Sequence, residues 1–257
     1  MLKGKNIVII GGTTGIGSSA AKYFSHEGAH VLAMGLSAGD IAETSDCKIF
    51  EGDARIEKHV EEALDFGLKT FGSIDGLYHV AGGSGRKWGD GPLHDLSTEA
   101  WNRTIEWNLT TVMISNRAFI RRLHEEQKSG AIVNLSSALV ESPSPRYFYT
   151  HSYITAKAGI IGFSKSIASY YASQNIRVNV ISPGLIRTPM SQRAQGNEEI
   201  QHFINHKQPL DGGRMGEPTD LDAAAAYFLS DHSKFTTGQE LVVDGGWSIS
   251  EGQYPSQ

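Results

Sequence analysis

Short apolar runs rich in β-branched residues alternate with longer stretches of helical pattern along almost the whole chain. Several of these runs are apolar throughout, which is typical of strands that are buried on both faces of a parallel sheet. Repeated alternation of strands and helices favours a doubly wound α/β fold. Seven strands are predicted, at Asn6–Ile10, Ala29–Met34, Cys47–Glu51, Ile74–Val80, Ala131–Ser137, Ile176–Ser182 and Glu240–Asp244.

The helical stretches complete a single domain. The sequence has 257 residues, no internal repeat and no linker that would separate two domains, so residues 1–257 are predicted to form one α/β domain with a seven-stranded parallel sheet flanked by helices. The connection Gly35–Asp46 is so short that we expect only a turn of helix in it. Longer helices are predicted at Ile16–Glu27, Ile56–Phe71, Thr98–Gln127, Ser152–Gln174 and Thr219–Ser230.

Charge and cysteine content argue against several classes of protein. The formal net charge is −5, whereas nucleic acids and anionic membranes attract basic surfaces, so neither is expected as a partner. The single cysteine, Cys47, permits no intrachain disulfide and is expected in the core. The apolar run Ile7–Ile10 is too short for a signal sequence or a membrane span. A cytoplasmic location is the simplest expectation.

A glycine-rich turn joins the first predicted strand to the first helix. It reads Gly11-Gly12-Thr13-Thr14-Gly15-Ile16-Gly17. Glycines allow a close approach of the backbone to a ligand, and the N–H groups and dipole of a helix N-terminus suit a pyrophosphate. The spacing differs from the commoner dinucleotide fingerprint, but a strand before the turn and a helix after it are the context that such a site requires. We therefore favour a dinucleotide site over an ordinary glycine-rich turn.

Tyr153 and Lys157 are four residues apart in a helical stretch and therefore share a face. A phenol is a poor base at neutral pH because its pKa is near 10. A nearby ammonium group stabilises the phenolate and lowers that pKa. Such a pair is suited to moving the proton of an alcohol while a hydride passes to or from a nicotinamide.

Together these stretches resemble the short-chain dehydrogenase/reductase family of the classical type, from Gly4 to Gly246. Ile10 stands where that family usually has Thr before the glycine turn. The resemblance implies a Rossmann fold, a nicotinamide cofactor, and an alcohol or ketone substrate. Further similar stretches are Gly52-Asp53-Ala54, Val80-Ala81-Gly82, Val133-Asn134-Leu135-Ser136-Ser137, Ser182-Pro183-Gly184, and Thr237-Gly238-Gln239 with Val243-Asp244-Gly245-Gly246.

The resemblance also implies catalytic residues. Tyr153 and Lys157 match the acid/base pair, and Asn108 matches the residue that holds a proton-relay water. Only one serine of the pair that ends the fifth strand can face the cofactor, because successive side chains alternate across a strand. We expect Ser137 to contact the substrate oxygen, with Ser136 as the alternative. The segment between Ser137 and Tyr153 is longer than is usual in the family, which bears on the shape of the substrate pocket.

The cofactor site implied by the resemblance draws on several loops. Asp53 is expected at the adenine, Ile186 at the carboxamide, and Thr188 at the carboxamide or the pyrophosphate. His79 and Val80 stand where the family usually has two Asn residues, so we expect the usual Asn contact to be lost. The complete set is Gly11, Thr13, Thr14, Gly15, Ile16, Gly17, Gly35, Leu36, Asp53, Ala54, Ala81, Gly82, Tyr153, Lys157, Pro183, Gly184, Ile186 and Thr188.

The choice between NAD and NADP depends on the end of the second strand. An acid there binds the ribose 2′-hydroxyl of NAD, whereas an arginine accommodates the 2′-phosphate of NADP. Gly35-Leu36-Ser37 supplies neither group, and Thr14 carries no positive charge. We favour NAD, because a 2′-phosphate would lack a compensating cation.

Candidate substrate residues lie in loops at the carboxyl ends of the strands, where ligands bind in such sheets. Basic residues there favour an anionic substrate such as a carboxylate or phosphate, unless they are simply solvated. A lid is expected over residues 190–207 by family analogy. Its His202 and His206 lack a third ligand, so no metal is expected. The candidates are Arg86, Trp88, Arg146 and Tyr147.

Three functions remain open from the sequence. We favour an oxidoreductase that acts on a secondary alcohol or ketone, with a sugar, polyol or hydroxy acid as substrate. An NADPH-dependent reductase of oxoacyl thioesters or ketones is the alternative. The third possibility is a nicotinamide-binding regulator without turnover. Such a protein is expected to lack one of the catalytic residues, whereas this sequence contains all four, namely Asn108, Ser137, Tyr153 and Lys157. The resemblance further implies a homotetramer.

Overall fold

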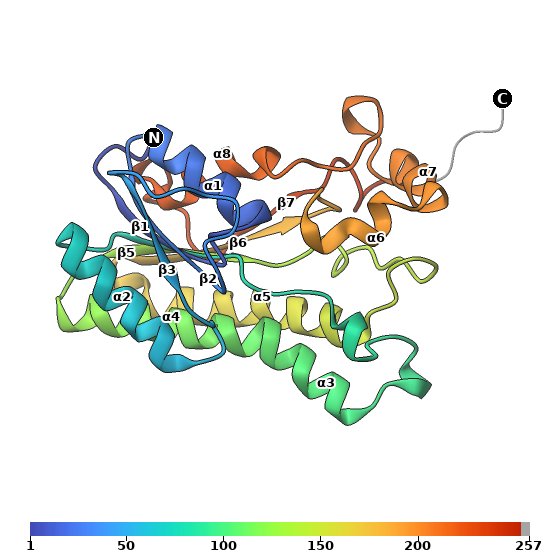
Figure 1. Cartoon of the computed structure of the whole chain (residues 1–257), viewed down its shortest axis with the longest axis horizontal. Coiled ribbons are helices and arrows are strands. Elements are labelled where there is room, and N and C mark those ends of the chain that lie inside the picture. Colours follow the sequence, from blue (N-terminus) through green and yellow to red (C-terminus); the bar gives the residue numbers. More distant parts are fainter. Residues whose placement is uncertain (253–257) are drawn as a thin grey trace.

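The computed structural model describes residues 1–252 and contains one parallel seven-stranded sheet (Figure 1). The strand order is β3-β2-β1-β4-β5-β6-β7, and each neighbouring pair is parallel. This confirms the predicted doubly wound α/β fold. The strands are β1 (Asn6–Ile10), β2 (His30–Gly35), β3 (Cys47–Glu51), β4 (Gly76–His79), β5 (Gly130–Leu135), β6 (Ile176–Pro183) and β7 (Glu240–Val243).

Helices cover both faces of the sheet, and the alternating side chains of the inner strand β1 supply a core to each face. Ile7 and Ile9 of β1 pack into the cluster with α1 (Gly15–His26) and α8 (Thr219–Leu229). Val8 and Ile10 pack into the opposite cluster. That second face is covered by α2 (Glu57–Phe71), α4 (Thr111–Glu125) and α5 (His151–Tyr171), as Figure 1 shows.

Two segments differ from the sequence prediction. No helical turn forms between β2 and β3. Gly39 adopts a positive φ of 61° there, and the Asp40 N–H donates to the Thr13 carbonyl oxygen, which ties the connection to the glycine turn. The long helix predicted over 98–127 is divided into α3 (Thr98–Ile105), a π-helical turn (Glu106–Thr110) and α4.

The segment that follows β6 contains helices that the sequence pattern did not predict. These are α6 (Gln192–Gln195) and α7 (Glu198–Lys207), after a short 3₁₀ turn at Pro189–Ser191. They project beyond the carboxyl ends of the strands (Figure 1). In residues 1–252, no helix is long and apolar enough to cross a membrane.

Candidate active site

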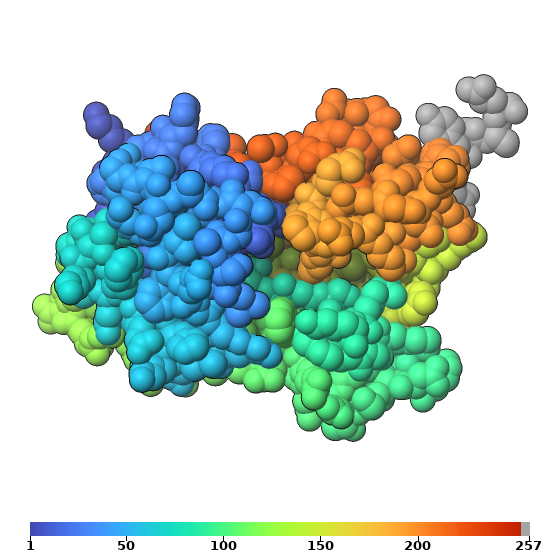
Figure 2. Space-filling view, viewed as in Figure 1, coloured from blue at the N-terminus to red at the C-terminus, as the bar shows by residue number. Residues whose placement is uncertain are grey.

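The main cavity opens at the carboxyl ends of the strands, where β1 and β4 are neighbours and the chain turns to opposite sides of the sheet. Ligands bind at such a switch point in doubly wound sheets. The cavity has a volume of about 860 Å³. Figure 2 shows a hollow between the N-terminal part of the chain, in blue and cyan, and the orange segment around residues 190–207. That segment contributes Met190, Ser191, Arg193 and Ala194 to the cavity wall.

Most residues implied by the family resemblance meet in this cavity. Asn108 and Gly17 pack behind the wall, because Asn108 is fully buried and a Cβ on Gly17 would lie 2.0 Å from the Gly11 carbonyl oxygen. The residues implied by the resemblance that line the cavity are Gly11, Thr13, Thr14, Gly15, Ile16, Gly35, Leu36, Asp53, Ala54, Ala81, Gly82, Ser137, Tyr153, Lys157, Pro183, Gly184, Ile186 and Thr188.

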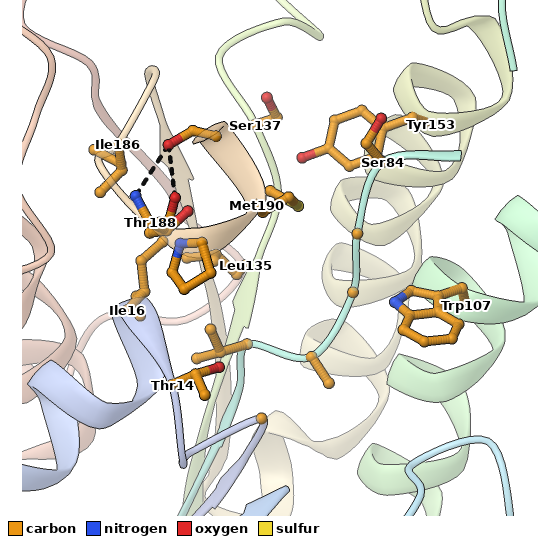
Figure 3. A pocket seen from close by; sticks show the side chains of 18 of the residues that line it. Thr14, Ile16, Ser84, Trp107, Leu135, Ser137, Tyr153, Ile186, Thr188 and Met190 are labelled. Atoms are coloured by element: carbon orange, nitrogen blue, oxygen red, sulfur yellow. Dashed lines mark hydrogen bonds between the residues drawn. The ribbon is translucent and has the colours of Figure 1, made fainter. Parts of the chain in front are cut away.

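The N-terminus of α1 is a suitable site for a pyrophosphate. Its first N–H groups have no intrahelical partner, its N-cap residue Thr14 makes no side-chain capping bond, and its first turn holds no acid. Thr14 and Ile16 border the cavity, and Thr188 lies beside this turn (Figure 3), since a Cβ on Gly15 would lie 3.3 Å from the Thr188 Cβ. A Cβ on Gly11 would lie 2.6 Å from the Ala81 nitrogen, so only glycine lets the turn pack this closely against β4. The donors and the shape therefore fit a dinucleotide.

Tyr153 and Lys157 both lie in the first two turns of α5. The Tyr153 hydroxyl points into the cavity (Figure 3), and burial raises its pKa to about 12, although a hydrogen bond with Ser137 acts in the opposite direction. The Lys157 ammonium lies 5.6 Å from the Tyr153 ring centroid and donates to the Leu135 carbonyl oxygen at 2.8 Å. Burial lowers the Lys157 pKa to about 8. At neutral pH the phenol is therefore protonated and the amine is mostly charged.

The two serines at the end of β5 point in different directions. The Ser136 hydroxyl donates to the Lys157 carbonyl oxygen at 2.9 Å and so binds the helix backbone. The Ser137 hydroxyl faces Tyr153 across the cavity (Figure 3). This geometry favours Ser137 as the serine that contacts a substrate oxygen.

Asn108 lies in the π-helical turn and holds the loop after β4. Its Oδ1 accepts from the Gly83 N–H at 3.1 Å, and its Nδ2 donates to the carbonyl oxygens of Gly83 at 3.0 Å and Thr104 at 2.9 Å. Turns of this kind are frequent at functional sites. The side-chain amide thus uses both of its donors on the protein itself, which makes Asn108 a positioning residue.

Asp90 is a positioning residue that the sequence pattern did not reveal. Its carboxylate accepts from the backbone N–H groups of Ser152 and Tyr153, each at 2.9 Å, and its side chain is buried. These are the two N–H groups that an N-cap side chain normally binds, whereas the N-cap residue Thr150 makes no such bond. Asp90 thus caps the catalytic helix from a loop 62 residues earlier in the chain.

Replacement of Asp90 by Ala is expected to lower the free energy of unfolding by about 2 kcal/mol, because two buried N–H groups lose a charged acceptor. Since one of them belongs to Tyr153, kcat is expected to fall about tenfold when the phenol is misplaced. NADH affinity is expected to stay unchanged. Urea unfolding and steady-state kinetics measure these effects. Asp95→Ala, an exposed acid of the same loop, is the control; equal losses in both variants would contradict the capping role.

Asp53, the residue expected at the adenine, lines the cavity and is already bound to Arg55. Its Oδ1 accepts from Arg55 Nε at 3.0 Å and its Oδ2 from Arg55 Nη2 at 2.5 Å. This hydrogen bonding holds the pKa of the carboxyl below its usual value. The Arg55 guanidinium also lies 4.7 Å from the centroid of Trp107, and Lys87 lies 4.6 Å from the same ring. Neither Trp107 nor Arg55 was identified from the sequence, because no motif marks them.

His79, which stands where the family usually has Asn, makes hydrogen bonds of its own. Its Nδ1 lies 2.7 Å from the Ser115 hydroxyl and its Nε2 lies 3.1 Å from the Ala81 carbonyl oxygen, so the ring links β4 to α4 below the cavity. Burial and the nearby Lys157 charge lower the pKa of the His79 ring to about 3, although the hydrogen bond to the Ala81 backbone acts in the opposite direction. His79 is therefore neutral and serves as a structural link.

The expected substrate residues do not all meet at one place. Arg86 and Trp88 line the main cavity. The Arg146 and Tyr147 side chains instead line a second, shallower depression beside α7, where both bind the Glu199 carboxylate. Of these two residues, Tyr147 reaches the main cavity through its carbonyl oxygen, which accepts from Arg86 at 2.9 Å.

The His202 and His206 rings meet edge to face on α7, with ring centroids 4.4 Å apart and an angle of 64° between their planes. Over the described range 1–252, no group of three or more His, Cys, Asp or Glu side chains is placed to hold a metal ion.

Comparison with known proteins gives the family. The profile of the family described as enoyl-(acyl carrier protein) reductase matches residues 11–248, which is most of the chain. The chain belongs to the short-chain dehydrogenase/reductase family. It is therefore an NAD(P)-dependent oxidoreductase that acts on an alcohol or ketone group.

Individual relatives cover nearly the whole chain. It is 33% identical to 3beta-hydroxysteroid dehydrogenase 1 of Eggerthella lenta, over 98% of this chain and 96% of that protein. It is 34% identical to the 3-oxoacyl-(acyl-carrier-protein) reductase FabG of Chlamydia muridarum, over 96% and 98%. A short-chain dehydrogenase of Leptospira borgpetersenii, solved with bound NAD⁺, superposes with a TM-score of 0.86 at 29% identity and covers 96% of this chain and 94% of that one.

Proposed function

We propose that the protein interconverts a secondary alcohol and its ketone on a small polar or anionic substrate, such as a sugar, a polyol or a hydroxy acid. The observation that carries this proposal is the Tyr153 hydroxyl facing Ser137 across the cavity, with Lys157 beside the phenol ring. Asn108 and Asp90 hold the surrounding loop and helix in place.

The nicotinamide cofactor, when bound, accepts or supplies the hydride. Ser137 donates a hydrogen bond to the substrate oxygen, and Tyr153 exchanges the proton with that same oxygen. The high pKa of Tyr153 keeps the phenol protonated, which suits it to donate a proton to a forming alkoxide during ketone reduction. In the oxidative direction the ammonium group of Lys157 lowers the pKa of the phenol, because it stabilises the phenolate.

We further propose that NAD is the cofactor. Gly35, Leu36 and Ser37 border the cavity and carry no charge. The Glu51 carboxylate accepts from the Ala38 N–H at 3.2 Å, next to these residues, and would repel a 2′-phosphate. Arg55, a cation on the same wall, is bound to Asp53. The arrangement therefore favours a ribose with a free 2′-hydroxyl.

Replacement of Ser37 by Arg is expected to tighten NADPH binding about tenfold to a hundredfold, because it supplies a charge-assisted partner for the 2′-phosphate. NADH affinity is expected to change little. Fluorescence titration of both cofactors gives the ratio of dissociation constants, and Ser37→Gln is the neutral control of similar length. If wild type already binds NADPH more tightly than NADH, the preference for NAD is wrong.

Two other functions are distinguishable by experiment. The relative named 3-oxoacyl-(acyl-carrier-protein) reductase keeps thioester reduction as the alternative. A regulator without turnover is disfavoured, because Asn108, Ser137, Tyr153 and Lys157 are all in place.

The test is turnover of the purified protein, followed by nicotinamide absorbance, with NAD⁺ or NADP⁺ and a panel of sugars, polyols, hydroxy acids and neutral secondary alcohols. The reverse direction uses ketones and an oxoacyl thioester. Oxidation of an alcohol with NAD⁺ supports the proposal. Exclusive reduction of the thioester with NADPH supports the alternative, and cofactor binding without any turnover supports the regulator.

We infer that copies of the chain associate, and we propose the homotetramer that the family resemblance implies. We also propose a cytoplasmic location. The edge strand β7 exposes Leu241, and Phe235 and Tyr170 are also well exposed. Exposed apolar side chains and an uncovered edge strand favour association between copies. Cys47 is buried and unpaired, which is compatible with a reducing compartment.

A further inference from the structure

The cavity is far more basic than the protein that contains it. Among its lining residues within 1–252, Asp53 is the sole acid and is bound to Arg55, whereas the whole chain has a net charge of −5. Low-dielectric clefts lined by one sign of charge concentrate ligands of the opposite sign. The remaining cations, besides the catalytic Lys157, are Arg86, Lys87 and Arg193.

Arg86 and Arg193 converge on one atom. Arg86 Nη2 donates to the Tyr147 carbonyl oxygen at 2.9 Å, and Arg193 Nη2 donates to the same oxygen at 2.8 Å. The two guanidinium groups therefore lie side by side, one from the loop after β4 and one from α6. Neither forms a salt bridge within the described residues. Because a guanidinium has five N–H donors, each retains several for a ligand.

Aromatic rings hold both guanidinium groups in position. Arg86 lies 4.9 Å from the ring centroid of Tyr149, and Arg193 lies 5.6 Å from that of Phe148. Stacking of this kind orients the planar group before a ligand arrives. Both rings and the shared carbonyl belong to one tripeptide, Tyr147–Tyr149, in the lengthened segment between Ser137 and Tyr153. That lengthened segment thus arranges the two arginines at the cavity.

The juxtaposition is unfavourable without an anion. Burial, and then the charge of Arg86, lower the pKa of Arg193. A single arginine is enough to tie the carbonyl of Tyr147 to the wall, and the second adds repulsion between like charges. A planar oxyanion placed between two guanidinium groups removes this repulsion and satisfies their remaining donors.

We propose that Arg86 and Arg193 together bind a carboxylate of the substrate, which is therefore a hydroxy acid or the matching oxo acid. This inference rests on the proposed function. Leu139, Phe148, Met190 and Trp247 line the same cavity and provide an apolar wall for the carbon chain. The carboxylate and the reacting carbinol carbon then occupy two ends of one pocket, with Tyr153 at the second end.

The test compares β-hydroxybutyrate with its methyl ester, and a series of longer hydroxy acids with theirs. Calorimetric titration into the enzyme–NADH complex measures binding without turnover. Wild type is expected to bind at least one acid about tenfold to a hundredfold more tightly than its ester, the range expected for charge-assisted hydrogen bonds. Arg86→Met and Arg193→Met are expected to remove this preference, whereas Arg193→Lys retains part of it.

Arg146→Met is the matched control, because Arg146 lies outside the cavity and binds Glu199. It is expected to keep the full preference for the acid. NADH affinity and thermal unfolding verify that each variant is folded.

The inference is overturned if no acid binds more tightly than its ester, if the preference survives in Arg193→Met, or if glycerol phosphate binds more tightly than every acid. These outcomes differ from failure of the proposed function. In that case NADH does not bind, or no alcohol of the panel is oxidised, whether it carries a carboxylate or is neutral.

Discussion

Tyr153→Phe is expected to reduce kcat by about a thousandfold, within the range that general acid/base catalysis contributes. The variant lacks the hydroxyl that exchanges a proton with the substrate oxygen, whereas its ring still fills the same space on α5. NADH affinity is expected to be unchanged, because the glycine turn and Thr188 are untouched. Steady-state kinetics and a cofactor titration separate the two effects.

Tyr170→Phe is the matched control, since it removes a hydroxyl from the same helix at an exposed position. It is expected to keep full activity. If Tyr153→Phe retains activity comparable to wild type, Tyr153 is not the acid/base, and the proton must come from another group in the cavity.

Lys157→Met is expected to lower the rate of alcohol oxidation by about a hundredfold, because the phenolate loses the ammonium group that stabilises it. The pH profile is expected to move as well. In wild type the ammonium is charged below a pH of about 8. Without it, the phenol pKa is expected to rise further above its ordinary value, because the phenolate loses a nearby positive charge, so oxidation requires a higher pH.

The same variant is expected to gain stability. The folded-state pKa of Lys157 lies below its ordinary value of 10.5 because burial penalises the ammonium form. At neutral pH this penalty opposes folding, and it diminishes as the pH rises above about 8. An apolar replacement removes the penalty and loses the bond to Leu135, so the net gain is on the order of 1 kcal/mol. A variant that loses both activity and stability, with an unshifted pH profile, would show that Lys157 has only a structural role.

The fold could be predicted from the sequence because its strands are short, apolar and separated by helical pattern. All seven strands of the sheet were identified, with ends that differ by only a few residues. The connection between β2 and β3 was predicted wrongly, because a tertiary hydrogen bond to Thr13 determines its shape. The π-turn at Asn108 was also missed, since helical periodicity continues through it.

Site residues were identifiable where a motif or a fixed spacing marks them, as for Tyr153 and Lys157. Asp90 was missed because it acts on a helix that begins some sixty positions later, and no local pattern records that contact. Arg193 was missed because its contact is with the carbonyl oxygen of Tyr147, which lies 46 residues earlier in the chain. Arg146 and Tyr147 were predicted at the substrate site, but their side chains line the second depression instead. A basic and aromatic sequence near a catalytic motif does not show which side chains of its loop face the cavity.

Titration of the protein with NADH, followed by energy transfer from tryptophan, tests the central claim most directly. Trp88, Trp107 and Trp247 line the cavity, so a dinucleotide bound there lies close to three of the four tryptophans. The structure predicts saturable quenching of tryptophan emission, a matching rise in NADH emission, and one site per chain. If neither NADH nor NADPH gives a saturable signal, the cavity does not hold a nicotinamide cofactor and the proposed chemistry at Tyr153 is wrong.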